Sequence, residues 1–481
     1  MTLGLYAHAL RSARPRQIAG RLTAPVRRRR FPDGEVPLFH PPTGPIGLWR
    51  SAAFEPAALA GSGGERLRAF HAHYGEDVLA AARAGDGDGA LRLALDWVDA
   101  NPPSPSDAWH PYTTSTRVGN WIAAASLEAV VADEHLVASL WRQLLHLALN
   151  VEDGVLGNHV IRNARALALG GAAFGDDRLL ARGRAILARE LPEQVLGDGG
   201  HYERSPVYHS IVLRDLLEIE AAAPGSVTTA TIESMRTFAG ALARPDGQPA
   251  LFNDGGLDQA PRLELPETPD GLGLFRETGY AVIRDGPLWL AFDCGPPSPV
   301  FLPAHAHADA LSVQLWWEGA PVVVDPGTFT YEAGADRDWF RGTEAHATVK
   351  VDGRDQFQLW GAFRSGPLPR VELLDASPTR LVGRVTLGSV RHTRTITVHG
   401  AGEVSISDLL EGEGEHDVVS SLPLGARPAA IQPVGPLAAS SEARWISERF
   451  FERVEGIALV QRGRLHLPAT IGWEIKLGPV A

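Results

Sequence analysis

The chain has 481 residues, too many for one small core, and its length predicts several domains. Hydrophobic residues make up 44% and charged residues 21%, which is typical of a globular protein. A net charge of −12 argues against a general nucleic-acid-binding protein. The single cysteine, Cys294, excludes an internal disulfide, and the lack of a long apolar run predicts no membrane span. We also expect no export signal at the N-terminus, and the compartment remains open. The oligomeric state is not readable from the sequence.

Residues 1–55 are rich in Arg and Pro, so we expect an irregular N-terminal arm with one short helix. Across residues 56–262, apolar residues recur at helical spacing between short polar connections. This pattern predicts an all-α domain. A Pro- and Gly-rich linker at 261–273 leads into segments of period two, as in PLWLAFDCG and RTITVHG. This pattern predicts an antiparallel β-domain over residues 263–481, most simply a sandwich.

The segment DAWHPYTTSTRVGNWI, at 107–122, combines aromatic and polar side chains. Trp109, Tyr112 and Trp121 could stack on sugar faces, and Arg117 could hold an acid group. The alternative is that these aromatic residues only pack between helices.

The segment LGNHVIRNARAL predicts a helix that begins after Gly157. Asn158 and His159 would then lie near its exposed N-terminal end, and Arg162 would share a face with Asn158. An amide, an imidazole and a guanidinium together could neutralise a substrate carboxylate. The alternative is an Asn cap beside a surface His.

The segment DGGHYERSPVYH contains a second predicted helix start, with Ser205 as the N-cap and Pro206 in the first position. Tyr208 would lie in the first turn, where the partial positive charge favours tyrosinate. Such a tyrosine could shuttle a proton, and Glu203 could support it. The alternative is a buried first-turn aromatic residue.

The segment HAHADALSVQLWW raises the question of three titratable groups at alternate positions. On a strand, His305, His307 and Asp309 would share one face with an apolar row. Buried without partners, each would cost about 1–3 kcal/mol, so a metal, each other or a polar cleft must satisfy them.

Two further residues complete a possible metal site. Asp325 ends the segment PVVVD, and His346 follows an Arg-rich loop. With His307, they make two imidazoles and one carboxylate, a ligand set typical of zinc. His305 would then be free to face a cleft. The alternative is a hydrogen-bonded His–Asp network without metal.

Taken together, these segments resemble the heparinase II/III-like family of polysaccharide lyases, which includes heparinases and oligoalginate lyases. The resemblance depends on WHPYTTSTRVGNWI, GNH, DGGHYERSPVYH, HAHADALSVQLWWEGAPVVVDPGTFTY and RGTEAHATVKVDG, in that order. It implies an N-terminal α/α toroid followed by a C-terminal antiparallel β-sandwich.

The resemblance also implies roles for single residues. Asn158 and His159 match the motif that neutralises the uronate carboxylate, Tyr208 matches the catalytic tyrosine, and His305 matches a catalytic histidine. His307, Asp325 and His346 match a mainly structural metal site, usually described as Zn²⁺, although another divalent metal would also fit. The family usually has His-Asn-Thr where this chain has His346-Ala347-Thr348, so an amide beside the ligand is lost.

Three functions remain open at this point. The first is β-elimination on an acidic polysaccharide or oligosaccharide. The second is a glycoside hydrolase on a similar helical scaffold, which would need two carboxylates, with Glu203 and Asp198 as candidates. The third is a non-catalytic glycan-binding protein of an exopolysaccharide system. The polymer, and endo or exo action, are not readable from the sequence.

Overall fold

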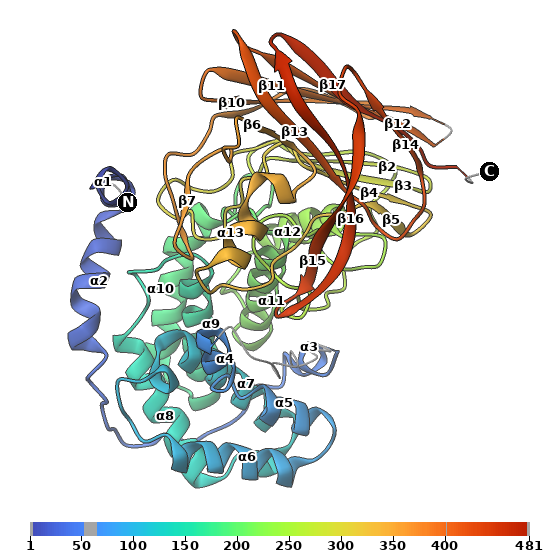
Figure 1. Ribbon diagram of the computed structural model, residues 1–481. Helices are drawn as coiled ribbons and strands as arrows, with labels where there is room; N and C mark the ends of the chain where they lie inside the picture. The colour runs from blue at the N-terminus through green and yellow to red at the C-terminus, as the bar shows by residue number, and fades with distance from the viewer. Residues whose placement is uncertain (1–2, 52–64, 401, 479–481) are drawn as a thin grey trace.

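The computed structural model describes residues 3–51, 65–400 and 402–478. Helices occupy the N-terminal half, and antiparallel sheets follow (Figure 1). This order agrees with the change of hydrophobic period in the sequence. No helix in the described ranges has the length and apolar character needed to cross a membrane.

The N-terminal arm is more helical than we expected. It contains α1 (Leu3–Ser12), α2 (Pro15–Arg27) and α3 (Ile46–Ser51) instead of one short helix. Pro15 stands in the first turn of α2, where a missing N–H costs nothing. Pro15 therefore helps to begin a helix. The expectation of an irregular arm took Pro only as a residue that interrupts helices.

The helical domain that follows is built from capped helices. Acidic or hydroxyl side chains at the N-caps of five helices accept backbone N–H bonds: Asp86, Asp133, Asp176, Ser205 and Thr228. The helices are α4 (Glu65–His71), α5 (Glu76–Arg83), α6 (Gly87–Ala100), α7 (Pro111–Leu127), α8 (Glu134–Leu149), α9 (Asn158–Phe174), α10 (Asp177–Gln194), α11 (Pro206–Ala222) and α12 (Thr229–Leu242), with 3₁₀ turns at Asp107–Trp109 and Ala129–Val131.

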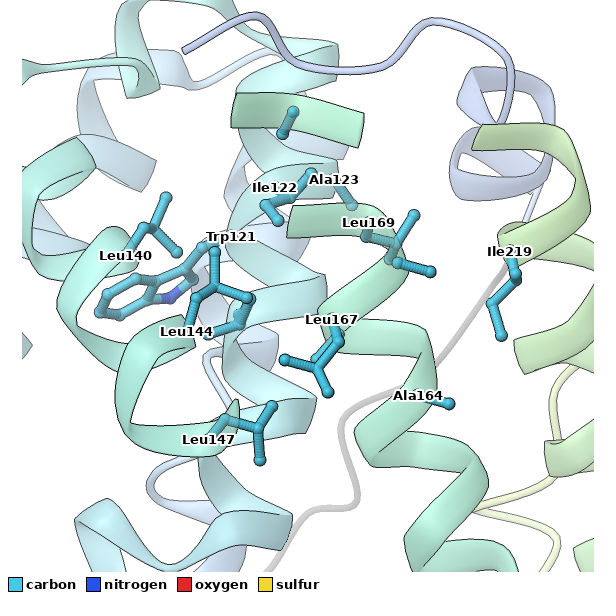
Figure 2. Packing of buried hydrophobic residues seen from close by; sticks show 14 of the residues in the cluster. Trp121, Ile122, Ala123, Leu140, Leu144, Leu147, Ala164, Leu167, Leu169 and Ile219 are labelled. Carbon is cyan, nitrogen blue, oxygen red and sulfur yellow. The ribbon is translucent and has the colours of Figure 1, made fainter. Parts of the chain in front are cut away.

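The core of this domain lies between α7, α8 and α9 (Figure 2). Trp121 and Ile122 of α7 pack with Leu140 and Leu144 of α8, and Leu167 of α9 lies beside them. All five side chains are buried. Burial of each large apolar side chain contributes about 1.5–3 kcal/mol, so this core fixes the position of α9.

The C-terminal half consists of antiparallel sheets, with strand orders β1-β2-β3-β4-β5, β14-β17-β12-β11-β10-β9, β15-β16-β13-β6 and β7-β8. The strands are β1 (Gly271–Phe275), β2 (Tyr280–Asp285), β3 (Leu288–Asp293), β4 (Val313–Trp317), β5 (Ala320–Val323), β6 (Val349–Val351), β7 (Leu359–Trp360), β8 (Arg364–Ser365), β9 (Val371–Ser377), β10 (Arg380–Leu387), β11 (Val390–Gly400), β12 (Glu403–Glu411), β13 (Glu415–Pro423), β14 (Ala430–Val434), β15 (Ala439–Arg449), β16 (Glu452–His466) and β17 (Ala469–Lys476). Between β5 and β6 lie α13 (Ala335–Arg341) and a 3₁₀ turn at Thr343–Ala345.

Apolar side chains join the two halves. Phe238 of α12 packs with Tyr280 and Trp289 of the first sheet. The arm also spans both halves, because Gln17 Nε2 donates to the Phe301 carbonyl oxygen while Arg16 pairs with Glu190 of α10. The loops of the β-domain are thereby held against the helical domain.

Candidate active site

A cavity of about 920 Å³ lies where the two halves and the arm meet. This volume is at the upper end of ordinary ligand pockets. Seven of the residues singled out in the sequence line it: Tyr112, Asn158, His159, Arg162, Glu203, Tyr208 and His305. The fold therefore brings together side chains that are up to 193 positions apart, from Tyr112 to His305.

The start of α9 holds a carboxylate. Gly157 caps the helix with φ +64°, and a Cβ there would clash with the Glu203 carboxylate. The Asn158 backbone N–H donates to Glu203 Oε1 at 2.6 Å, and the Asn158 side-chain amide donates to the same oxygen at 3.2 Å. An acidic group at a helix N-terminus is favourable, and here it orients the Asn158 amide beside the cavity.

His159 is paired with a buried glutamate. Its Nδ1 atom lies 3.1 Å from Glu152 Oε1, and its ring packs 4.3 Å from that of Tyr112. Burial alone would lower the pKa of His159, but Glu152 raises it above its ordinary value. The pKa of Glu152 falls to about 2 despite its burial, because His159 and Asn163 favour the carboxylate. Glu152 therefore favours the imidazolium form of His159.

Tyr208 occupies the predicted first turn of α11. Ser205 caps the helix and accepts the Tyr208 backbone N–H at 3.2 Å. The Tyr208 hydroxyl lies 2.8 Å from that of Tyr331, and its ring stacks 4.0 Å from the His305 ring. Burial raises the pKa of Tyr208 well above its usual range, although the Tyr331 contact lowers it. The expected tyrosinate is therefore not favoured, and Tyr208 rests as a phenol.

His305 lies between two carboxylates. Its Nδ1 atom is 3.0 Å from Asp254 Oδ2, and its Nε2 atom is 3.2 Å from Glu203 Oε2. Glu203 thus links His305 to Asn158 across the cavity.

The sequence analysis missed the buried ion pair behind His305. Asp254 is fully buried, and both of its oxygens accept from Arg337 of α13. Asp254 Oδ1 also lies 2.9 Å from His307 Nε2. Burial would raise the pKa of Asp254, but Arg337 holds it well below its usual range. The NDGG turn that carries Asp254 was the only available signal, and it reads as an ordinary loop.

The residues of HAHAD do not lie on a strand, as we had predicted. Residues 305–312 form an irregular segment, and β4 begins only at Val313. Leu311 has φ +65°, which breaks the alternation of a strand. His307 and Asp309 are nonetheless fully buried, while His305 lines the cavity.

Two of the predicted metal ligands, His307 and His346, lie close to Asp309. Ligand atoms of His307, Asp309 and His346 lie within 4.8 Å of one another. Asp325, which we had nominated in place of Asp309, lies 2.8 Å from His346 Nδ1. Neither side-chain oxygen of Asp309 has a hydrogen-bond partner among the described residues, and nor does His307 Nδ1.

Loss of the usual amide at position 347 does not release His346. Ala347 packs in the apolar core between the sheets. His346 Nε2 lies 3.1 Å from the Phe340 carbonyl oxygen, and Nδ1 faces Asp325. These two contacts fix the ring.

Three proposed substrate contacts are corrected by their burial. Trp109, Arg117 and Trp121 lie inside the helical domain, at 3%, 0% and 0% exposure, and away from the cavity as described. The Arg117 guanidinium stacks on Trp97 and donates to Gln143. These side chains pack between helices, the alternative that the sequence had left open.

The structure also places two further charged candidates, Arg162 and Asp198. Arg162 lines the cavity with its Nε atom 3.0 Å from Asp215 Oδ2, so part of its charge is already compensated. Asp198 lies outside the described cavity lining and accepts from Thr278 Oγ1 at 2.6 Å. It therefore cannot act with Glu203 as a hydrolase pair.

Known proteins resemble both halves of the chain. A family model for the heparinase II/III N-terminus matches residues 91–264, and one for the heparinase II/III-like C-terminal region matches residues 267–458. FtsZ-localized protein C of Caulobacter vibrioides is 27% identical over 300 residues, which are 58% of this chain and 51% of that protein. Heparin-sulfate lyase of Bacteroides stercoris is 25% identical over 303 residues, which are 52% of this chain and 44% of that protein. The match thus spans about half the length of these curated relatives.

A crystal structure of heparinase III has the same architecture, with a TM-score of 0.68 and 17% identity, and covers 86% of this chain and 77% of its own. The predicted fold, an α/α toroid followed by an antiparallel β-sandwich, is confirmed. With both halves matched in order, the chain belongs to the heparinase II/III-like family.

Proposed function

We propose that this protein is a polysaccharide lyase that cleaves an acidic, uronate-containing polysaccharide or oligosaccharide by β-elimination. One observation carries the proposal: Asn158, His159, Tyr208 and His305 line a single cavity, with Tyr208 stacked on His305. An amide, a phenol and two imidazoles therefore share one site.

Asn158 and His159 neutralise the uronate carboxylate. The proton at C5 of a uronate is weakly acidic because its conjugate base spreads charge onto that carboxylate. The amide of Asn158 and the imidazolium of His159 would stabilise the enolate that forms as the proton leaves. Glu152 favours the charged form of His159 for this task.

Tyr208 and His305 move the protons. A base removes the C5 proton, the electron pair forms the C4–C5 double bond, and the C4–O4 bond breaks. The phenol of Tyr208 gives its proton to the departing O4. His305 or Tyr208 takes the C5 proton, according to the stereochemistry of the sugar.

The contacts of His305 set a condition on its use as a base. Its Nε2 atom lies 3.2 Å from Glu203 Oε2, so the ring can take the C5 proton only while Nε2 carries no proton of its own. Tyr331 can donate to the oxygen of Tyr208 at 2.8 Å and so steady a transient phenolate. The two side chains therefore have different partners for the two protons.

We also propose a divalent metal site, with zinc the best match, at His307, Asp309, His346 and Asp325. Support comes from the buried Asp309 oxygens and His307 Nδ1, which lack partners among the described residues. Two imidazoles with carboxylates suit zinc. When bound, the ion would supply charge that holds these loops together behind His305, a structural role.

The test is the ultraviolet absorbance of the unsaturated product while the protein meets a panel of uronate polymers. We expect Tyr208→Phe to lower the rate by about 10²–10⁴-fold. Tyr280→Phe is the matched control, because it removes a buried hydroxyl outside the cavity.

Other outcomes would overturn the proposal. New reducing ends without a change in absorbance would indicate hydrolysis. Glycan binding without any new ends, unchanged in Tyr208→Phe, would indicate a binding protein.

A further inference from the structure

The N-terminal arm builds one wall of the cavity. Gly20, Arg21, Arg27 and Arg28 all line it. The Gly20 backbone packs directly on Gly154, where a Cβ would clash. The guanidinium groups of Arg21 and Arg27 donate to the main-chain oxygens of Gly154 and Leu149, each at 3.0 Å. These contacts anchor the arm without using a carboxylate.

Positive charge collects where the arm meets α4 and the start of α7. Arg28 and Arg66 both line the cavity, and neither forms an ion pair with a carboxylate among the described residues. Two acidic groups lie near them. His159 and Asn163 already occupy the oxygens of Glu152, and Glu332 accepts the Arg66 backbone N–H at 3.3 Å. Arg66 lies over the Phe70 ring, which packs 5.0 Å from His110. The guanidinium groups of Arg28 and Arg66 are therefore available to an anion in the cavity.

The contacts of His110 point to an anion at this place. Its Nδ1 atom accepts the Tyr112 backbone N–H at 3.3 Å as the N-cap of α7. Its Nε2 atom lies 3.0 Å from Arg28 Nη2, which is a second donor. A neutral imidazole has one acceptor nitrogen, so two donors face it and only one can be satisfied. An anion between them would accept from both Arg28 and the Nε2–H group.

We propose that Arg28, Arg66 and His110 form a second anion subsite, which binds a carboxylate or sulfate group on a neighbouring sugar of the same glycan. The inference rests on the proposed function, because the subsite lies in the same cavity. Glu152 connects the two places: it is 3.9 Å from His110 Nδ1 and 3.1 Å from His159 Nδ1. The arm thus selects chains with an acidic group beyond the uronate that is cleaved.

The test measures binding without cleavage, in the Tyr208→Phe background. The probes are a heparin tetrasaccharide, tetragalacturonate and neutral maltotetraose, each titrated by calorimetry. We expect Arg28→Ala to weaken at least one acidic probe by about tenfold or more, as for a hydrogen bond to a charged group. Arg29→Ala is the matched control, because this neighbouring arginine is exposed and lies outside the cavity lining. Arg28→Lys should recover part of the loss.

The outcomes separate the subsite from the activity. If Arg28→Ala loses affinity for the heparin probe alone, the subsite binds sulfate. If it loses affinity for both acidic probes, the subsite binds carboxylate as well. Equal affinity of Arg28→Ala and Arg29→Ala, or no binding of an acidic probe by the parent, overturns the subsite. Elimination is measured on the same variants with Tyr208 restored, so a failure of the lyase activity is seen independently.

Discussion

The helical wall and the β-domain wall of the cavity hold their side chains in different ways. On the helical wall, Asn158 and Tyr208 stand in the first turns of α9 and α11, where Gly157 and Ser205 set the helix start. On the other wall, His305 lies on an irregular segment and depends on Asp254, 51 positions away. The first wall is fixed by local structure, and the second by buried charges that only the fold brings together.

Removal of the Asp254 charge should destabilise the β-domain wall. We expect Asp254→Asn to lower the free energy of unfolding by about 3–5 kcal/mol, because it leaves Arg337 buried without its partner. Denaturant unfolding measures the loss. Asp285→Asn, an exposed position on β2, serves as the control. A change of less than about 1 kcal/mol, the usual worth of a surface pair, would show that Asp254 does not hold this wall.

A substitution on the helical wall should lower the activity of the protein without lowering its stability. We expect Asn158→Ala to lower kcat/KM for elimination by about 10²–10³-fold, as for the loss of one donor to a developing negative charge. Asn101→Ala, at the end of α6 and outside the cavity lining, controls for the loss of an amide. An Asn158→Ala variant with the activity of this control would remove Asn158 from the chemistry.

The Glu152–His159 pair on the helical wall adds a pH dependence. The pKa of His159 is raised, so its contribution to stability is present below its ordinary value of 6.5 and is lost as pH rises through the folded value. The pKa of Glu152 is lowered from 4.5 to about 2, so its contribution is present above 4.5 and is lost as pH falls toward 2. The pair therefore stabilises the protein most between these limits.

Substitution of this glutamate sharpens the comparison. We expect Glu152→Gln to lower the free energy of unfolding near neutral pH by about 1.5–3 kcal/mol, as for a hydrogen bond between charged groups. Burial would then lower the pKa of His159, and the alkaline decline of kcat/KM would move to lower pH. An unchanged pH profile would mean that His159 does not act as a cation.

The difference between the walls explains what the sequence could predict. The starts of α9 and α11 follow from a glycine and from Ser-Pro, whose effects are local. The place of Asn158, His159 and Tyr208 was therefore predictable. Asp254 and Arg337 are 83 positions apart, and no local pattern marks them as partners.

The errors have the same origin. The alternation in HAHAD predicts a strand, but His307 pairs with the distant Asp254 and Leu311 has a positive φ, so the chain follows an irregular path. Trp109 and Trp121 are of the residue type that stacks on sugars, and only the packing around α7 shows that they face inward. The arm was read as irregular because contacts such as Arg16 with Glu190, 174 positions apart, are not visible in its sequence.

The smallest expected effect concerns the contact where the two walls meet. Tyr331→Phe removes the hydroxyl that lies 2.8 Å from Tyr208 and leaves the ring against Phe450. A hydrogen bond of this kind contributes about 0.5–1.5 kcal/mol, so we expect kcat to fall by about two- to tenfold with little change in KM. Without this donor the pKa of Tyr208 should rise further, because burial then acts unopposed by the contact. A loss as large as that of Tyr208→Phe would instead make Tyr331 a proton donor in its own right, and the β-domain wall would then supply a second reacting group besides His305.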